Sequence, residues 1–498
     1  MNNENTFYDF ENVRSREAGD ISQICEGEFA LPDYVGDLSS IISYDMTPKI
    51  LSKKQIANKL DLECVLEIRV ICLNTDNELF SYEYKYNFVK SIEDINEGDI
   101  VFVSPSVDQT VLRQSAERKI YFKAELTFNT EIYTNQSSKA LLSCEEPSFK
   151  YKKDSYNVLS KYNLYEKSEV YNDIVSLNKP MNDVKTVLRK HSVAFVSDCK
   201  IISKKALLKG EIKNDFIYID TQDNVQKLRT ILPFSYVIDI NEEETNDIQY
   251  NASCKAISTE ISPNVDEDGT FSSYSIKIKL NLFLSVCGKS NVTLINDLYS
   301  TVYDADIEKE DIEIIASKDV YKENITVKKD FEIPEDVNSI YDAWFTVDNL
   351  KCNNTDDGVN VTGTINLKYL CSTKDGAYSI IDDKTEFEYN ADINAPGDVC
   401  NAFFVPYECE FSLNGNRLSV KFEGNIVIKN CVKETVSVVT NATILDKSEN
   451  NQSQIIVYYP DENEDLWEIA KRFKADSDDI ATSCGEDQTD TSALIIQR

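Results

Sequence analysis

Length, composition and charge already exclude several classes of protein. The chain has 498 residues, 42% of them apolar, which is enough for roughly three or four domains with packed cores. Its 86 acidic residues outnumber 52 basic ones and give a net charge of -34, a balance that repels phosphate backbones and anionic lipids. We therefore expect no nucleic-acid binding. We also expect no membrane insertion, because no run of about 20 apolar residues occurs and the acidic start MNNENTFYDF is unlike a signal peptide.

Residues that carry catalysis or bind metals are sparse in this sequence. The 13 cysteines form no C-x-x-C pair, so they indicate reduced core residues and no metal site. His191 is the one histidine, and no nucleophile motif accompanies it. The sequence has no glycine-rich phosphate loop, so we expect no nucleotide or other cofactor. These observations favour a non-catalytic protein, with a glycosidase hidden among the many carboxylates as an alternative.

Three segments of the chain align without a gap over 51 positions. Each copy has an Asp near its start, a small residue that opens an alternating run, and a Phe further on. The three sets are Asp37, Cys64 and Phe88; Asp183, Gly210 and Phe234; and Asp336, Gly363 and Phe387. Self-similarity of this kind indicates duplicated structural units.

Each copy has the pattern of a β-hairpin followed by a long strand. Apolar and polar residues alternate after the opening residue, as in CVLEIRVICL from Cys64 to Leu73. A polar turn such as NTDNE follows, and each copy later contains a long alternating run such as residues 119–128. The sequence therefore predicts a mostly β protein with three repeated antiparallel β-sandwich-like domains.

The repeats divide the chain into domains. We place the three β-sandwich-like domains at residues 28–145, 180–328 and 329–450. Residues 146–179 are rich in Tyr, Lys and Ser and show weak periodicity, which favours a linker. An arm that docks one copy of an oligomer onto another is the alternative for this segment.

Residues 454–498 predict a small βααβ domain. SQIIVYYP is typical of a strand, LWEIAKRF of an amphipathic helix capped by Asp465, DSDDIATSC of a second short helix, and ALIIQR of a closing strand. This order of elements, and the stretch from Leu466 to Ala470, resemble the LysM module. The resemblance implies two loops that form a shallow groove for N-acetylglucosamine polymers.

These two loops are acidic, whereas a sugar site needs neutral hydrogen-bonding groups. Glu464 and Asp465, for example, stand where the LysM family has Asp and Thr. Carboxylates are costly to desolvate against a neutral sugar, but they suit a basic patch on a protein. We therefore predict a partner-binding face, with a glycan site and a solvated helix-capping face as alternatives. The residues of this predicted face are Asn463, Glu464, Asp465, Trp467, Asp476, Asp478 and Asp479.

The second copy resembles the SPOCS domain over LLKGEIKNDFIYIDTQDNVQKLRTILPFSYVIDI, from Leu207 to Ile240. SPOCS domains occur in endospore coat proteins of spore-forming Firmicutes, and the pairing with a C-terminal LysM is similar to clostridial coat morphogenesis proteins. The resemblance implies a non-catalytic scaffold in the mother-cell cytoplasm at the forespore surface. It also implies a stage IV sporulation ATPase-like coat protein as the partner of the LysM. The alternative is a protein that binds peptidoglycan or another N-acetylglucosamine polymer through the same module.

Overall fold

The computed structural model describes residues 5–19, 21–243, 247–265, 270–355, 358–393, 397, 399–447, 455–461, 464–477, 480 and 494–497. Antiparallel strands account for most of these residues, which confirms the predicted mostly β fold. Within the described ranges one α-helix is defined, α1 (Leu466–Phe473), and no helix there is long and apolar enough to cross a membrane.

The strands are, in chain order, β1 (Thr6–Glu17), β2 (Ile21–Ala30), β3 (Leu38–Ile56), β4 (Lys59–Asn74), β5 (Leu79–Glu93), β6 (Ile100–Ala116), β7 (Lys119–Ser143), β8 (Phe149–Asn182), β9 (Val184–Ile202), β10 (Lys205–Asp220), β11 (Val225–Asp239), β12 (Ile248–Val265), β13 (Thr270–Ser300), β14 (Tyr303–Glu332), β15 (Val337–Thr355), β16 (Gly358–Thr373), β17 (Tyr378–Ala391), β18 (Val399–Asn414), β19 (Arg417–Lys447), β20 (Ile455–Tyr458) and β21 (Leu494–Gln497).

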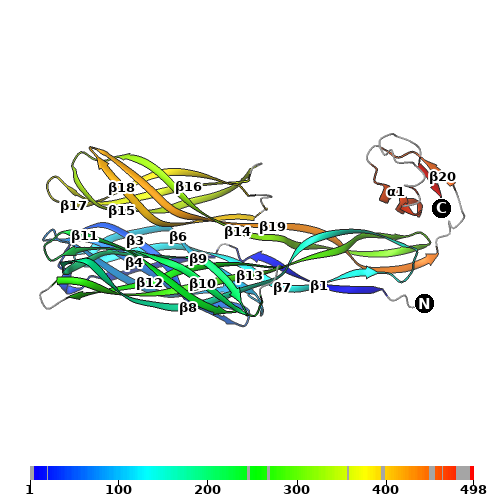
Figure 1. The fold of residues 1–498 in the computed structure, drawn as a ribbon, viewed down its shortest axis with the longest axis horizontal. Coiled ribbons are helices and arrows are strands. Elements are labelled where there is room, and N and C mark those ends of the chain that lie inside the picture. The colour runs from blue at the N-terminus through cyan, green and yellow to red at the C-terminus, as the bar shows by residue number, and fades with distance from the viewer. Residues whose placement is uncertain are drawn as a thin grey trace.

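The strands build the same two-sheet sandwich three times (Figure 1). In sandwich one, the sheet β3-β4-β5 packs on β2, β6 and the first half of β7. In sandwich two, the sheet β9-β10-β11 packs on the β12-β13-β8 sheet. In sandwich three, the sheet β15-β16-β17 packs on the β14-β19-β18 sheet. We call the three sandwiches together the head.

Each sandwich is held together by the alternation that the sequence shows. In β7, for example, Ile120, Phe122, Ala124, Leu126 and Phe128 are all buried, and the residues between them are more exposed. A period of two places one face of a strand in the core and the other toward solvent. Because a fully buried large apolar side chain contributes about 1.5–3 kcal/mol, this face stabilises the sandwich strongly.

The recurring small residue and the recurring Phe are partners across each predicted hairpin. In sandwich two, Gly210 of β10 lies opposite Phe234 of β11, and the ring covers the glycine. A Cβ on Gly210 would approach the carbonyl oxygen of Phe195 to 2.1 Å and the Phe234 ring to 2.5 Å. Gly363 pairs with Phe387 in the same way. The three predicted hairpins are therefore confirmed, and glycine is required at this position of sandwich two by a close approach of the backbone.

The long strands continue past the sandwiches into a stalk made of three two-stranded ribbons (Figure 1). Residues 134–143, 289–300 and 432–447 pair with residues 6–14, 149–159 and 303–317, respectively. All three ribbons contribute to a common apolar core that includes Ala140, Leu294 and Val438. The stalk therefore repeats the threefold plan of the head.

The prediction of a linker at residues 146–179 is wrong. Residues Phe149–Asn182 form β8, which pairs with β13 along most of its length; residues 177–180 have no partner in this ladder. Register shifts at Phe271/Ser273, Gly288/Lys289 and Ile295/Asp297 interrupt the ladder. Because each shift changes the face to which the following side chains point, a strand of this kind shows little period-two alternation.

The predicted domain boundaries also differ from the structure. Strand β1 lies before residue 28 and pairs with the end of β7, so the first unit begins earlier than expected. Residues 303–328 belong to β14, which pairs with β19 of the third unit. The units share long strands in the stalk, so they do not separate at single points of the chain.

Candidate partner-binding surface

The C-terminal module consists of β20, β21, α1 and the described residues around them. The two strands pair antiparallel, and Ile456, Ile496 and the apolar stripe of α1 form its core. Asp465 caps the helix, because its Oδ1 accepts a hydrogen bond of 3.1 Å from the backbone N–H of Trp467. The predicted first helix and its cap are therefore confirmed.

The predicted second helix is described only at its start. The backbone N–H of Ile480 donates to the carbonyl oxygen of Asp476 over 3.2 Å, which is the spacing of one helical turn. Three residues of the predicted face, Asn463, Asp478 and Asp479, lie outside the described residues.

Trp467 of the predicted face is turned toward the end of the stalk. Its indole lies edge-on to Tyr299 of β13, with ring centroids 4.9 Å apart. Its Nε1–H donates a hydrogen bond of 2.8 Å to Oδ2 of Asp297. The Tyr299 side chain is 5% exposed and its hydroxyl donates to the carbonyl oxygen of Ala475 over 2.8 Å. A stalk residue thus forms part of the core of the module.

Asp297 is the centre of this contact, which we call the stalk joint and define as Asp297, Tyr299, Lys309, Trp467 and Lys471. The Nζ of Lys471 and the Nζ of Lys309 each lie within 2.8 Å of its carboxylate. Burial alone would raise the pKa of Asp297, but hydrogen bonds from the two lysines and the indole together lower that pKa to about 2. The carboxylate therefore stays charged and tightly bound near neutral pH.

The other described acids of the predicted face also contact the chain itself. Asp465 accepts a hydrogen bond of 2.9 Å from Lys152 of β8, which lowers its pKa. Asp476 forms an ion pair with Lys150 of the same strand. Glu464 instead stays within the module, where it accepts hydrogen bonds from Tyr458 and Arg472. Most of the described predicted face is thus in contact with the stalk.

A different side of the module is apolar and exposed. The outer face of β20–β21 carries Ile455, Val457 and Ile495, whose exposed fractions are 74%, 57% and 46%, and Tyr459, directly after β20, is 72% exposed. Val457 lies directly opposite Ile495 across the two strands. The sequence carries a signal for this face, because SQIIVYYP is apolar without alternation, and such a run places apolar side chains on both sides of a strand.

Catalytic and metal-binding groups are few in the described part of the chain. No group of three or more His, Cys, Asp or Glu residues there is arranged to hold a metal ion. His191 lies on β9, and burial, together with the nearby charges of Arg189 and Arg69, lowers its pKa to about 3. The ring is therefore neutral near pH 7, and no hydrogen bond joins it to another described residue.

Comparison with known proteins identifies one part of the head. Residues 183–262 match the family model described as SipL, SPOCS domain. They comprise β9, β10, β11 and most of β12, including the pair of Gly210 and Phe234. Neither the curated proteins nor the solved structures gave a match. Sandwich two is therefore similar to the SPOCS domain of SipL, and this similarity links the chain to sporulation.

Proposed function

We propose that this chain is a non-catalytic scaffold in the assembly of the endospore envelope. It would act in the mother cell at the forespore surface and bind a stage IV sporulation ATPase-like coat protein through its LysM-like C-terminal module. Two observations support the proposal: the similarity of sandwich two to a SPOCS domain, and the exposed apolar face of β20–β21.

The apolar face of β20–β21 is the main support for the proposal. Exposing apolar side chains to water is unfavourable in free energy, and a bound partner would cover them. Three exposed large apolar side chains share one face of a two-stranded sheet, and exposed Tyr459 follows directly after β20. Contiguous exposed apolar surface is typical of sites that bind other proteins. The described part of the sheet also has two open edges, so a partner can add a strand to it.

The stalk joint explains how the module can present this face. It holds the module through Trp467 and Lys471, on a side of the module other than the outer face of β20–β21. The module lies at the far end of the stalk from the head (Figure 1). A partner bound there would be kept away from the three sandwiches. Glu464 and Arg472, which are paired beside the sheet, would add charged contacts that select the partner.

The alternative function is binding of peptidoglycan or another N-acetylglucosamine polymer. Such a ligand would use the indole of Trp467, which in this chain packs edge-on against Tyr299 and donates its N–H to Asp297. A sugar that stacks on this indole would compete with the stalk joint. The structure therefore favours a protein partner over a glycan.

The test measures binding of the purified ATPase-like coat protein to the full chain and to the double variant Val457→Asp, Ile495→Asp. Both residues are exposed, so the fold should survive, and we expect the affinity to fall at least about tenfold because two apolar contacts are lost. The matched control is Ile174→Asp, an exposed apolar residue of β8. Equal affinity of the double variant and the control would contradict the proposal. Saturable binding of a chitooligosaccharide that is lost in Trp467→Ala would favour the glycan.

A further inference from the structure

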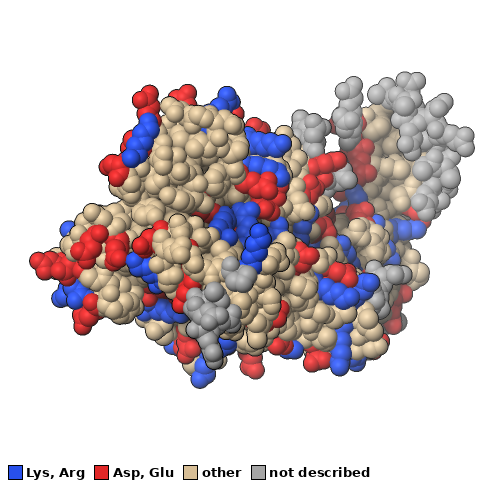
Figure 2. Space-filling model, turned by 60° about the vertical axis from the view of Figure 1, so that its left-hand side comes forward, with Lys and Arg blue, Asp and Glu red and all other residues tan. Residues whose placement is uncertain are grey.

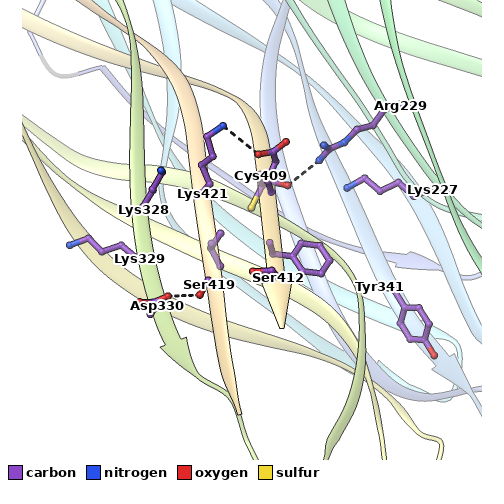
Figure 3. Close-up of a pocket in the computed structure, with 13 residues that line it drawn as sticks. Lys227, Arg229, Lys328, Lys329, Asp330, Tyr341, Cys409, Ser412, Ser419 and Lys421 are labelled. Carbon is purple, nitrogen blue, oxygen red and sulfur yellow. Dashed lines mark hydrogen bonds and ion pairs between the residues drawn. The ribbon is translucent and has the colours of Figure 1, made fainter. Parts of the chain in front are cut away.

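A basic groove lies between sandwich two and sandwich three, on the head and far from the C-terminal module. It encloses about 960 Å³, and its cations are Lys227, Arg229, Lys328, Lys329 and Lys421. Figure 3 shows Lys227 and Arg229 on one side and the three other lysines opposite them. Figure 2 shows basic side chains gathered in a hollow at the lower border of sandwich three, which is the upper part of the head in Figure 1. Asp330 and Glu410 are the acids of the lining, so cations exceed acids by three (5 - 2).

The two sides of the groove come from different sandwiches. Lys227 and Arg229 lie on β11, the edge strand of its sheet. The guanidinium of Arg229 crosses to sandwich three, where it donates to Glu408 and to the carbonyl oxygen of Cys409, each over 3.0 Å. Lys227 forms an ion pair with the buried Asp342 of β15. These contacts fix the two sides relative to each other, so the groove is preformed.

The opposite side has two cations that no described acid neutralises. Lys328 of β14 lies directly across from Lys421 of β19 in the ladder. Like charges at directly opposed positions destabilise an antiparallel sheet. Lys421 is compensated by Glu410 and Glu423, whereas Lys328 and Lys329 are exposed and form no ion pair with any described residue. A negatively charged ligand would neutralise Lys328 and Lys329.

We propose that the basic groove binds an acidic, extended peptide segment of a partner protein. The volume exceeds what a single small anion fills. The lining also offers the hydroxyl of Ser412 and the rings of Tyr341 and Phe411, which suit hydrogen bonding and apolar contact with a peptide. A nucleic acid fits less well, because the chain carries a net charge of -34 and Asp330 and Glu410 would face its phosphates. The groove thus adds a second contact to the proposed scaffold, independent of the C-terminal module.

The test titrates the full chain with a fluorescent peptide of about ten residues in which Glu alternates with Tyr. We expect saturable one-to-one binding that weakens as salt rises from about 0.05 to about 0.5 M, because exposed charges are screened. The double variant Lys328→Glu, Lys329→Glu should lower the affinity at least about tenfold, since two attractive charges become repulsive. The matched control is Lys351→Glu, Lys384→Glu, which changes the net charge equally on exposed lysines of sandwich three outside the groove. This control should stay within about twofold of the wild type.

Three results would overturn the proposal. They are no saturable binding at low salt, equal losses in both double variants, and tighter binding of a single-stranded RNA of matched charge. Two double variants test the basic groove and the proposed function of the C-terminal module independently. Lys328→Glu, Lys329→Glu should leave binding of the ATPase-like protein unchanged, and Val457→Asp, Ile495→Asp should leave binding of the acidic peptide unchanged.

Discussion

The head and the C-terminal module are stabilised in contrasting ways. Each sandwich of the head has about twenty buried apolar residues contributed by two sheets. The module is joined to the stalk by Tyr299, by the buried carboxylate of Asp297, which binds Lys471 and the Trp467 indole, and by three more exposed ion pairs. The stability of the head is therefore spread over many contacts, whereas attachment of the module depends on a few polar groups. Single substitutions should affect the two regions very differently.

The largest effect is expected for Asp297→Ala. This change leaves Lys309, Lys471 and the Trp467 indole without their shared partner, and breaking a buried ion pair from one side costs about 3–5 kcal/mol. We expect the module to leave the stalk while the head stays folded. The emission of Trp467 should shift to the red as its indole meets water, and the other tryptophan, Trp344, is buried in the head and serves as an internal reference.

The control for this change is Asp304→Ala. Asp304 pairs with Lys474 at the same end of the stalk, but its side chain is more than half exposed, so its loss should cost less than about 1 kcal/mol. An unchanged emission spectrum in Asp297→Ala would show that the stalk joint does not hold the module.

A smaller effect is expected for Gly210→Ala in sandwich two. The new Cβ would overlap the carbonyl oxygen of Phe195, which is backbone, and the Phe234 ring. Overpacking of this kind costs about 1–3 kcal/mol, which should appear as a lower urea midpoint without loss of the fold. Gly288→Ala is the matched control, because its nearest neighbour at 3.0 Å is the Ser160 hydroxyl, a side chain that can rotate. Equal midpoints for the two variants would contradict this reading of the Gly210 and Phe234 pair.

The β-hairpins could be predicted from the sequence because they depend on patterns among residues close together in the chain. Alternating strands, polar turns and the spacing from Gly210 to Phe234 all act within about 30 residues, so the hairpins could be inferred. The stalk could not be inferred, because Phe149 pairs with Ser300 and no local pattern links them. Strand β8 resembles a linker in sequence because three register shifts interrupt its alternation.

In the candidate site, too, local contacts could be predicted from the sequence and contacts between distant residues could not. The cap from Asp465 to the N–H of Trp467 spans two residues and was predictable from the sequence. The bond from the Trp467 indole to Asp297 joins residues 170 positions apart, so the sequence gives no sign that the indole contacts the stalk. The apolar outer face of β20 was visible as an uninterrupted apolar run, but a run of that length is equally typical of a fully buried strand.

Hydrogen–deuterium exchange of the full chain, alone and with the ATPase-like coat protein, tests most directly whether the module binds its partner while it stays on the stalk. We predict slower exchange in Ile455–Tyr458 and Leu494–Gln497 when the partner is present. We also predict unchanged, slow exchange at the stalk end, residues 297–300. Faster exchange at the stalk end on binding, with no protection of the outer face of β20–β21, would contradict it, because the partner would then be using the side of the module that contains Trp467.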